Sequence, residues 1–158
     1  MTGRTLYVGH AVTKVGKGGR IKIPQAFGAV LSKNGGQLRL LIGRSPTDNC
    51  WVCYDAGLRT LDVDQCRALI YPRDFESAES LSDLDRSILG SLFVLDVSLG
   101  YSIKLPKALA GSFFEGEQLV FVSLGYAFEI WDIDDLLKST QIHKNLADLV
   151  QAEKTLRH

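Results

Sequence analysis

The pattern of apolar and polar positions predicts short strands interrupted by turns. Ile21-Lys22-Ile23 alternates apolar and polar residues, as does Ile103-Lys104-Leu105, so the lysines lie on one face of each strand. A proline follows each stretch, at positions 24 and 106, where it ends the strand and suits the first turn of a helix. We therefore expect helices over residues 25–32 and 107–114. Further strands are expected over residues 11–15, 38–42, 51–54, 92–97, 118–123 and 127–131.

These stretches recur in the same order, which indicates an internal repeat. Residues 21–27 (IKIPQAF) align with residues 103–109 (IKLPKAL), 82 positions later. Each copy spans about 45–50 residues and is expected to run strand, strand, helix, strand, strand. So short a unit leaves sheet edges unpaired, and two copies packed together could close them into one small barrel. The expected fold class is mainly β with helices (α+β), built from two tandem units.

Further segments predict helices around the two units. Residues 56–69, 84–89 and 134–156 are expected to be helical, the last with one apolar stripe. Residues 72–82 are polar and acidic, which is typical of a linker or loop. The chain is thus divided into a first, basic unit at residues 5–60, a helical linker at 61–90, a second unit at 91–132 and a C-terminal helix at 133–158.

The charges are distributed unevenly, although they cancel over the 158 residues. Residues 1–60 hold nine basic and two acidic side chains (+7), whereas residues 61–158 hold nine basic and sixteen acidic ones (−7). This asymmetry indicates an anion-binding surface on the first part, or two parts that pack on each other or on a neighbouring subunit. No apolar stretch approaches the roughly 20 residues of a membrane span, and the first residues lack the pattern of a signal peptide. We expect a cytoplasmic protein without a membrane partner.

Metal, cofactor and catalytic chemistry find little support in the sequence. Cys50 and Cys53 form a C-x-x-C pair, a spacing found in zinc and redox sites. The stretch 50–54 has the pattern of a strand, which directs the two cysteines to opposite faces, and no second Cys or His pair completes a tetrahedral site. Asp132, Asp134 and Asp135 are better explained as the negative start of a helix than as metal ligands. We expect no cofactor, no metal, no small-molecule substrate and no enzymatic activity.

Two segments carry motifs that can be compared with a known family. Residues 12–24 read VTKVGKGGRIKIP, and residues 128–132 read FEIWD. The first resembles the D-x-K-G-R-[IL]-x-[IV]-P box of MraZ proteins, and the second matches the F-E-I-W-D signature of the same family. Smaller similarities lie at residues 7–10, 49–50 and 54–55, so the likeness runs from about Tyr7 to Leu137.

The resemblance implies a fold and a function. MraZ proteins share the swapped-hairpin β-barrel of AbrB-like regulators, with two such units related by a pseudo-two-fold axis in one chain. They are bacterial transcription regulators that bind repeated operator boxes upstream of the division and cell-wall gene cluster, and they form ring-shaped homo-oligomers. By resemblance, we expect a repressor in the nucleoid whose partner is double-stranded promoter DNA.

The expected DNA-binding residues come from the first unit. The box arginine of the family faces DNA, and this role carries over to Arg20. Lys17, Lys22 and Lys14 are expected to lie on the same hairpin and to supply phosphate contacts and register. Arg4 is expected to join them from the N-terminal arm.

The box also departs from the family in both units. Gly16 and Gly18 stand at its acidic and lysine positions, and Gly28 replaces an arginine of the following helix. In the second unit the box arginine is absent, and its position is Tyr101 or Ser102, depending on the alignment. DNA binding is therefore expected to depend on the first unit. The alternative is a MraZ-like assembly or interaction protein that has lost sequence-specific DNA binding.

Overall fold

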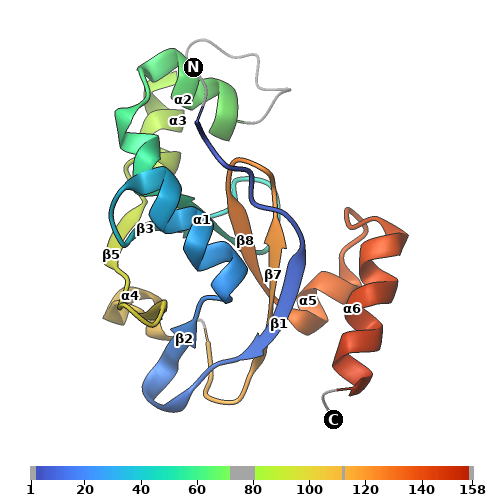
Figure 1. Ribbon diagram of the computed structural model, residues 1–158. Helices are drawn as coiled ribbons and strands as arrows, with labels where there is room; N and C mark the ends of the chain where they lie inside the picture. Colours follow the sequence, from blue (N-terminus) through green and yellow to red (C-terminus); the bar gives the residue numbers. More distant parts are fainter. Residues whose placement is uncertain (1–2, 72–80, 112, 157–158) are drawn as a thin grey trace.

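The computed structural model describes residues 3–71, 81–111 and 113–156, which form a six-stranded sheet, a two-stranded sheet and surrounding helices (Figure 1). All strand pairs among these residues are antiparallel. The structure is thus a mixed α and β fold. The linker expected over residues 72–82 lies almost entirely outside the described residues. No helix in the described ranges has both the length and the apolar composition to cross a bilayer.

The six-stranded sheet places strands from both halves of the chain side by side. Hairpins β3–β4 and β7–β8 meet at its centre, where β4 pairs with β8. At the edges, β1 pairs with β7 and β5 pairs with β3, so each edge strand lies against a strand from the other half of the chain. The order across the sheet is β1 (His10–Lys14), β7 (Gln118–Ser123), β8 (Phe128–Asp132), β4 (Trp51–Asp55), β3 (Arg39–Arg44) and β5 (Phe93–Asp96).

The two-stranded sheet joins the two copies of the repeated motif. β2 (Arg20–Lys22) pairs with β6 (Ser102–Lys104), and Ile21 lies opposite Ile103. These two isoleucines are the residues that align in the internal repeat, so the copies pair with each other at equivalent positions. Both side chains are buried, with 0% and 1% of their surface exposed. The pair therefore points its apolar positions into the core and its polar positions outward.

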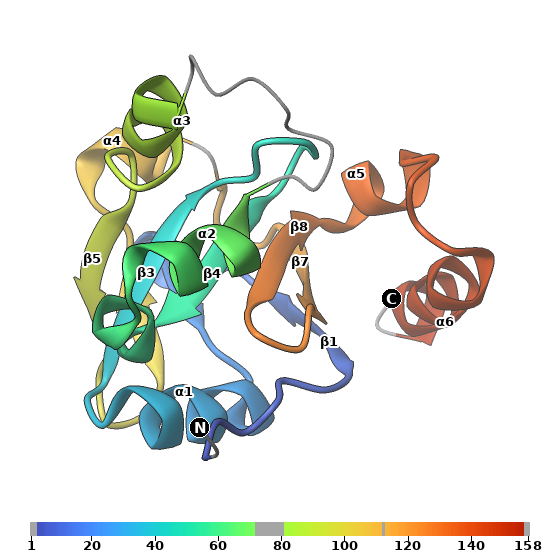
Figure 2. The same cartoon turned by 90° about the horizontal axis from the view of Figure 1, so that it is seen from above.

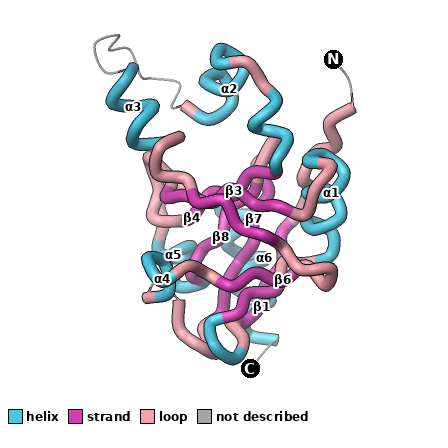
Figure 3. Tube along the Cα trace, turned by 90° about the vertical axis from the view of Figure 1, so that its left-hand side faces the viewer, coloured by secondary structure: helices cyan, strands magenta, loops and turns pink. Residues whose placement is uncertain are grey.

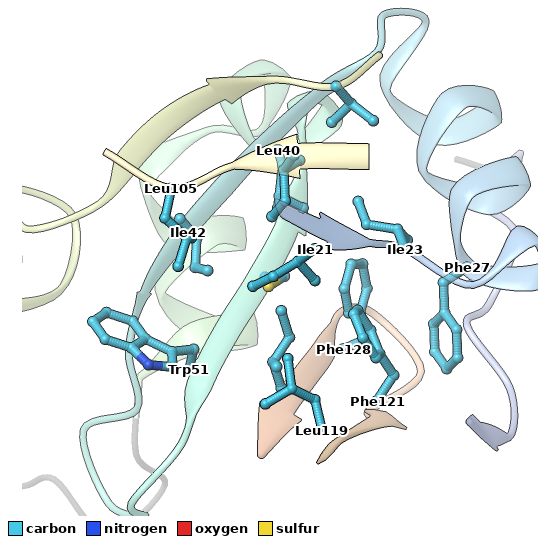
Figure 4. Packing of buried hydrophobic residues seen from close by; sticks show 14 of the residues in the cluster. Ile21, Ile23, Phe27, Leu40, Ile42, Trp51, Leu105, Leu119, Phe121 and Phe128 are labelled. Atoms are coloured by element: carbon cyan, nitrogen blue, oxygen red, sulfur yellow. The ribbon is translucent and has the colours of Figure 1, made fainter. Parts of the chain in front are cut away.

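The main core lies between the two sheets, α1 (Gln25–Gly35) and α4 (Lys107–Ala110). Four aromatic rings contact one another there, with centroids 5.2–6.3 Å apart, namely Tyr7, Phe27, Phe121 and Phe128. Ile21 reaches into the same core from β2 (Figure 4). Burial of this much apolar surface is the main force that stabilises a domain of this size. It also anchors β2, the strand that carries the basic residues.

Two separate groups of helices cover the opposite face of the six-stranded sheet. α5 (Ile133–Lys138) and α6 (Lys144–Leu156) lie against β1 and β7, where Val150 is fully buried. The 3₁₀ turn η2 (Ala56–Thr60), α2 (Val63–Ile70) and α3 (Leu81–Ile88) lie over β3 and β4. Figure 2 shows these two groups well apart from each other. α2 and α3 lie at one end of the molecule and the β2–β6 pair at the other (Figure 1, Figure 3).

Two of the expected long helices are wrong as single elements. The segment expected over residues 56–69 divides because Asp55 caps η2 and Asp62 begins α2 with a capping box shared with Gln65. The segment expected over residues 134–156 divides at residues 139–143, where the side chains of Ser139 and His143 accept backbone N–H bonds. Short polar side chains compete with the helix for backbone groups, which apolar periodicity alone does not reveal.

The lengths of the two repeat helices also differ from those expected. α1 extends to Gly35, past residue 32, and α4 ends at Ala110, before residue 114. The negative helix start at residues 132–135 is confirmed. Asp132 accepts bonds from the backbone N–H groups of Asp134 and Asp135 at 2.9 and 3.0 Å.

Candidate nucleic-acid interface

β2 orients the basic residues of the first copy by simple alternation. Ile21 is buried, whereas Arg20 and Lys22 on either side of it are exposed. Across the two-stranded sheet, Arg20 lies opposite Lys104, and Lys22 lies opposite Ser102. Residues directly opposite each other in an antiparallel pair share a face. The outer face of this small sheet therefore presents three cationic side chains and one hydroxyl group.

Glycines shape the loop between β1 and β2. Gly18 and Gly19 have φ angles of 73° and 77°, a left-handed conformation that residues with a Cβ rarely adopt. The Gly16 N–H group donates to the Arg20 carbonyl at 2.7 Å, and the Gly19 N–H group donates to the Gly16 carbonyl at 3.1 Å. These bonds close the loop on itself and place the exposed Lys17 within the same tight turn that leads to Arg20.

The basic residues line an open cleft of about 490 Å³. The four basic residues that line it are exposed, and none of them forms an ion pair within the described part of the chain. Positive charges that gather around one concavity raise the local potential for an anion. The four basic residues are Lys14, Lys17, Arg20 and Lys22, and the opposite wall is formed by Gly100 and Ser102 of the second copy.

The expectation that these residues lie on one hairpin is wrong. β1 pairs with β7, with Lys14 opposite Gln118, whereas β2 pairs with β6. The Val15 N–H group donates to the carbonyl of Glu117 at 2.9 Å, so the chain leaves β1 still bound to the second half. The cations therefore come from two different sheets, and pairing with the second half of the chain brings them to one cleft.

Arg4 does not join this cleft. Its guanidinium group donates to both carboxylate oxygens of Asp55, at 3.0 and 3.1 Å, and to the Tyr126 carbonyl at 3.2 Å. Asp55 is fully buried and also accepts bonds from the Tyr7 hydroxyl at 2.7 Å and the Gly57 N–H group at 2.9 Å. The N-terminus lies at the opposite end of the molecule from β2 (Figure 1). We therefore exclude Arg4 from the candidate interface.

The second copy presents a turn of different chemistry beside the cleft. At the repeat offset, Leu99 corresponds to Lys17, and Ser102 corresponds to Arg20. Leu99 is 91% exposed. The cationic residue that the second copy does bring to the outer face is Lys104, which sequence reasoning had not assigned to the interface. Alternation placed Lys104 on the polar face of its own strand, and its pairing with Arg20 brings that face beside the first copy.

Two of the departures from the MraZ pattern contact each other. Tyr101 has a positive φ angle of 62°, and its ring lies against Gly28 of α1. A Cβ atom at position 28 would lie 2.5–2.8 Å from three atoms of that ring. The absence of a side chain at Gly28 is therefore what leaves space for the aromatic ring of the second copy.

A carboxyl pair lies beside Lys14, which sequence reasoning also missed. Glu117 precedes β7, Asp132 ends β8, and both line a cavity with Lys14. Burial and a hydrogen bond with Asp132 raise the pKa of Glu117 to about 7. Burial alone would raise the pKa of Asp132, but hydrogen bonds from Glu117 and from two backbone N–H groups lower it instead. Glu117 therefore keeps its proton in a range where an isolated glutamate would already be charged.

The three cysteines lie in three different apolar clusters. Cys53 is in the main core, Cys50 lies near α5, and Cys66 lies in the cluster under α2 and α3. All three are buried free thiols, and burial raises the pKa of each. Among the residues described, no group of three or more His, Cys, Asp or Glu side chains is arranged to hold a metal ion.

Comparison with known proteins leaves the family of this chain open. Neither the protein-family models nor the curated proteins compared with it gave a match. The resemblance to MraZ proteins rests on residues 12–24 and 128–132, and what it implies is a proposal. The first of these two motifs supplies most of the residues that line the basic cleft, and Gly100 and Ser102 supply the rest.

Proposed function

We propose that this protein is a DNA-binding transcription regulator that acts through the basic cleft. The observation that supports it is the set of four exposed cations around one concavity, none of them paired with an acid among the described residues. Phosphate contacts supply much of the affinity of such proteins, and arginine can bind a guanine edge with two hydrogen bonds. In this proposal Arg20 reads base edges, while Lys14, Lys17 and Lys22 bind phosphates and set the register.

We further infer a pseudo-two-fold, swapped-hairpin barrel of the AbrB-like kind. Two observations support this architecture, namely the exchange of edge strands between the halves and the pairing of Ile21 with Ile103. Such an arrangement would bring the two copies of the box to one face. Only the first copy would then supply an arginine to that face.

The biological role is proposed by resemblance to MraZ proteins. The chain would act as a repressor of the division and cell-wall gene cluster, bound to repeated operator boxes in the nucleoid. One protomer offers few DNA contacts, so a homo-oligomer that engages several boxes at once would be needed for high affinity.

The second candidate is an assembly or interaction protein without sequence-specific DNA binding. It is favoured by the exposed Leu99 beside the cleft and by the missing arginine of the second copy. Exposed apolar side chains are more typical of protein contacts than of phosphate contacts.

Fluorescence anisotropy at two salt concentrations separates the two candidates. The probe is the DNA upstream of the protein's own gene cluster, and a scrambled duplex of equal length is the control. With three phosphate contacts per protomer, from Lys14, Lys17 and Lys22, affinity should fall roughly 40-fold for each engaged protomer between about 50 and about 200 mM salt. No binding to the upstream DNA at the lower salt would favour the assembly protein.

The variant Arg20→Ala tests whether Arg20 recognises the DNA sequence. It should abolish the preference for upstream over scrambled DNA and leave the oligomer size unchanged, as measured by light scattering. Arg59→Ala is the matched control, because Arg59 is an exposed arginine on η2 that does not line the basic cleft. Wild-type preference in the Arg20 variant would show that another residue reads the sequence.

A further inference from the structure

A second cleft lies on the outer face of the six-stranded sheet. Its volume is about 390 Å³, which is within the range of small-molecule sites. Its walls come from the β3–β4 loop, the end of α2, the β7–β8 loop and the outward residues of β4 and β8. It shares no lining residue with the basic cleft. Its chemistry can therefore be considered independently of DNA binding.

Glu129 supplies a buried carboxyl group to this cleft. Only 7% of its surface is exposed, and it faces outward from β8, beside Val52 of β4. Its carboxylate accepts a hydrogen bond from the indole N–H group of Trp131 at 2.9 Å and a second from the thiol of Cys50. Both donors are neutral, and Glu129 has no ion-pair partner within the described ranges. Burial raises its pKa, as expected for a carboxyl group that lacks a counter-charge.

A second carboxyl group strengthens the negative character of the cleft. Asp48, in the β3–β4 loop, lines the same cavity and is close enough to Glu129 to raise the pKa of Glu129 further by repulsion. No Lys, Arg or His is among the residues that line this cavity in the described part of the chain. Two acids with no base among the described lining residues favour a cation over an anion in this partly buried site.

Aromatic rings form another part of the lining. Tyr54 and Tyr126 stack with their ring centroids 6.4 Å apart and an angle of 26° between their planes, and Tyr71 lies on the same cavity. Aromatic faces attract cations and also accept alkyl groups. Val52 and Leu124 add apolar surface. The lining thus combines negative charge with apolar and aromatic surface.

We propose that this cleft binds a small organic cation with an alkyl body, specifically a primary alkylammonium ion. The ammonium group lies at Glu129 and Asp48 and supplies the counter-charge that the described residues do not. The alkyl chain lies against Tyr54, Tyr126 and Leu124. The site is an effector site on the protein, separate from the proposed DNA interface.

Titration with n-hexylammonium chloride, followed by NMR, tests this site in the full-length protein. The indole N–H signal of Trp131 reports directly, because that group donates to Glu129. The indole signal of Trp51 serves as an internal reference, since Trp51 does not line this cleft. We expect a saturable shift of the Trp131 signal with hexylammonium, and none with 1-hexanol or sodium hexanoate at equal concentration. Acidification should weaken binding, because protonated Glu129 no longer attracts the ammonium group.

Three variants complete the test. Glu129→Gln keeps an acceptor for Trp131 but removes the charge, and should weaken hexylammonium binding at least tenfold. Asp48→Asn should weaken it several-fold, and its place in an exposed loop keeps the test valid if the Glu129 variant fails to fold. Glu115→Gln, an exposed carboxyl change outside the cleft, should leave the affinity unchanged. Equal binding of hexanol, unchanged affinity in both cleft variants, or no saturable shift would overturn the proposal.

Discussion

The contact between Gly28 and Tyr101 gives a prediction whose sign depends on the structure. A Cβ atom at position 28 would lie 2.5, 2.6 and 2.8 Å from three ring carbons of Tyr101, whereas carbon atoms pack best at about 3.5–4.0 Å. Elsewhere in a helix interior, replacing glycine by alanine stabilises the protein by about 1 kcal/mol. Overpacking a closed site costs roughly 1–3 kcal/mol. We therefore expect Gly28→Ala to destabilise the protein, by up to about 2 kcal/mol.

Hydrogen bonds fix the backbone of Tyr101, so its ring can move away from the new methyl group only by a change of side-chain rotamer. The Tyr101 carbonyl accepts the N–H group of Ile23 at 2.7 Å, and its own N–H group donates to Ser98 at 2.9 Å. In a Tyr101→Gly background the ring is absent, and a positive φ angle suits glycine. In that background, Gly28→Ala should stabilise the protein by about 1 kcal/mol.

Urea denaturation followed by circular dichroism measures all four free energies of unfolding in this cycle. Gly111→Ala is the matched control, because Gly111 has right-handed helical backbone angles and no atom within 4 Å of its ideal Cβ position. We expect that control to be neutral or slightly stabilising. If Gly28→Ala stabilises the wild type as much as it stabilises the Tyr101→Gly variant, then the two residues are not in tight contact and the reasoning is refuted.

Two further predictions concern charged groups outside the basic cleft and outside the cleft at Glu129. Arg4→Ala should lower the free energy of unfolding by roughly 3 kcal/mol, because it leaves Asp55 buried without its cation, while the salt dependence of DNA affinity stays unchanged. The pKa of Glu117 is raised from 4.5 to about 7, so the folded state holds this proton more tightly than the unfolded state does. The melting temperature should therefore decline between about pH 4.5 and about pH 7. Glu117→Gln should remove that part of the decline, and Glu115→Gln, at an exposed position, should retain it.

Most of the strands were predictable from local pattern. Alternation identified β2 and β6, and the strand predicted over residues 118–123 has the same bounds as β7. These predictions succeeded because side chains alternate along any strand, whatever it pairs with. The repeat offset also identified Ile21 and Ile103 as equivalent residues. It could not reveal that they lie opposite each other.

Helix ends were predicted less well. The division of residues 56–69 depends on the caps supplied by Asp55 and Asp62. Capping residues can be read from the sequence, so the Asp62 and Gln65 spacing was an available signal for this break. The end of α4 also had a local signal, because Gly111 directly follows Ala110 and glycine is common just past the end of a helix.

Some features of the candidate sites could also be predicted from the sequence, whereas others depend on the tertiary structure. The sequence alone determined which residues are cationic, that Arg20 and Lys22 flank a buried isoleucine, and that positive charge concentrates in the first 60 residues. Only the tertiary structure decided that Lys14 reaches the same cleft from another sheet, that Arg4 is engaged by Asp55, and that Glu129 lacks a cation among the described residues. The physical reason is that periodicity reports the face of one element at a time. Strand pairing between residues about 100 positions apart determines which faces meet.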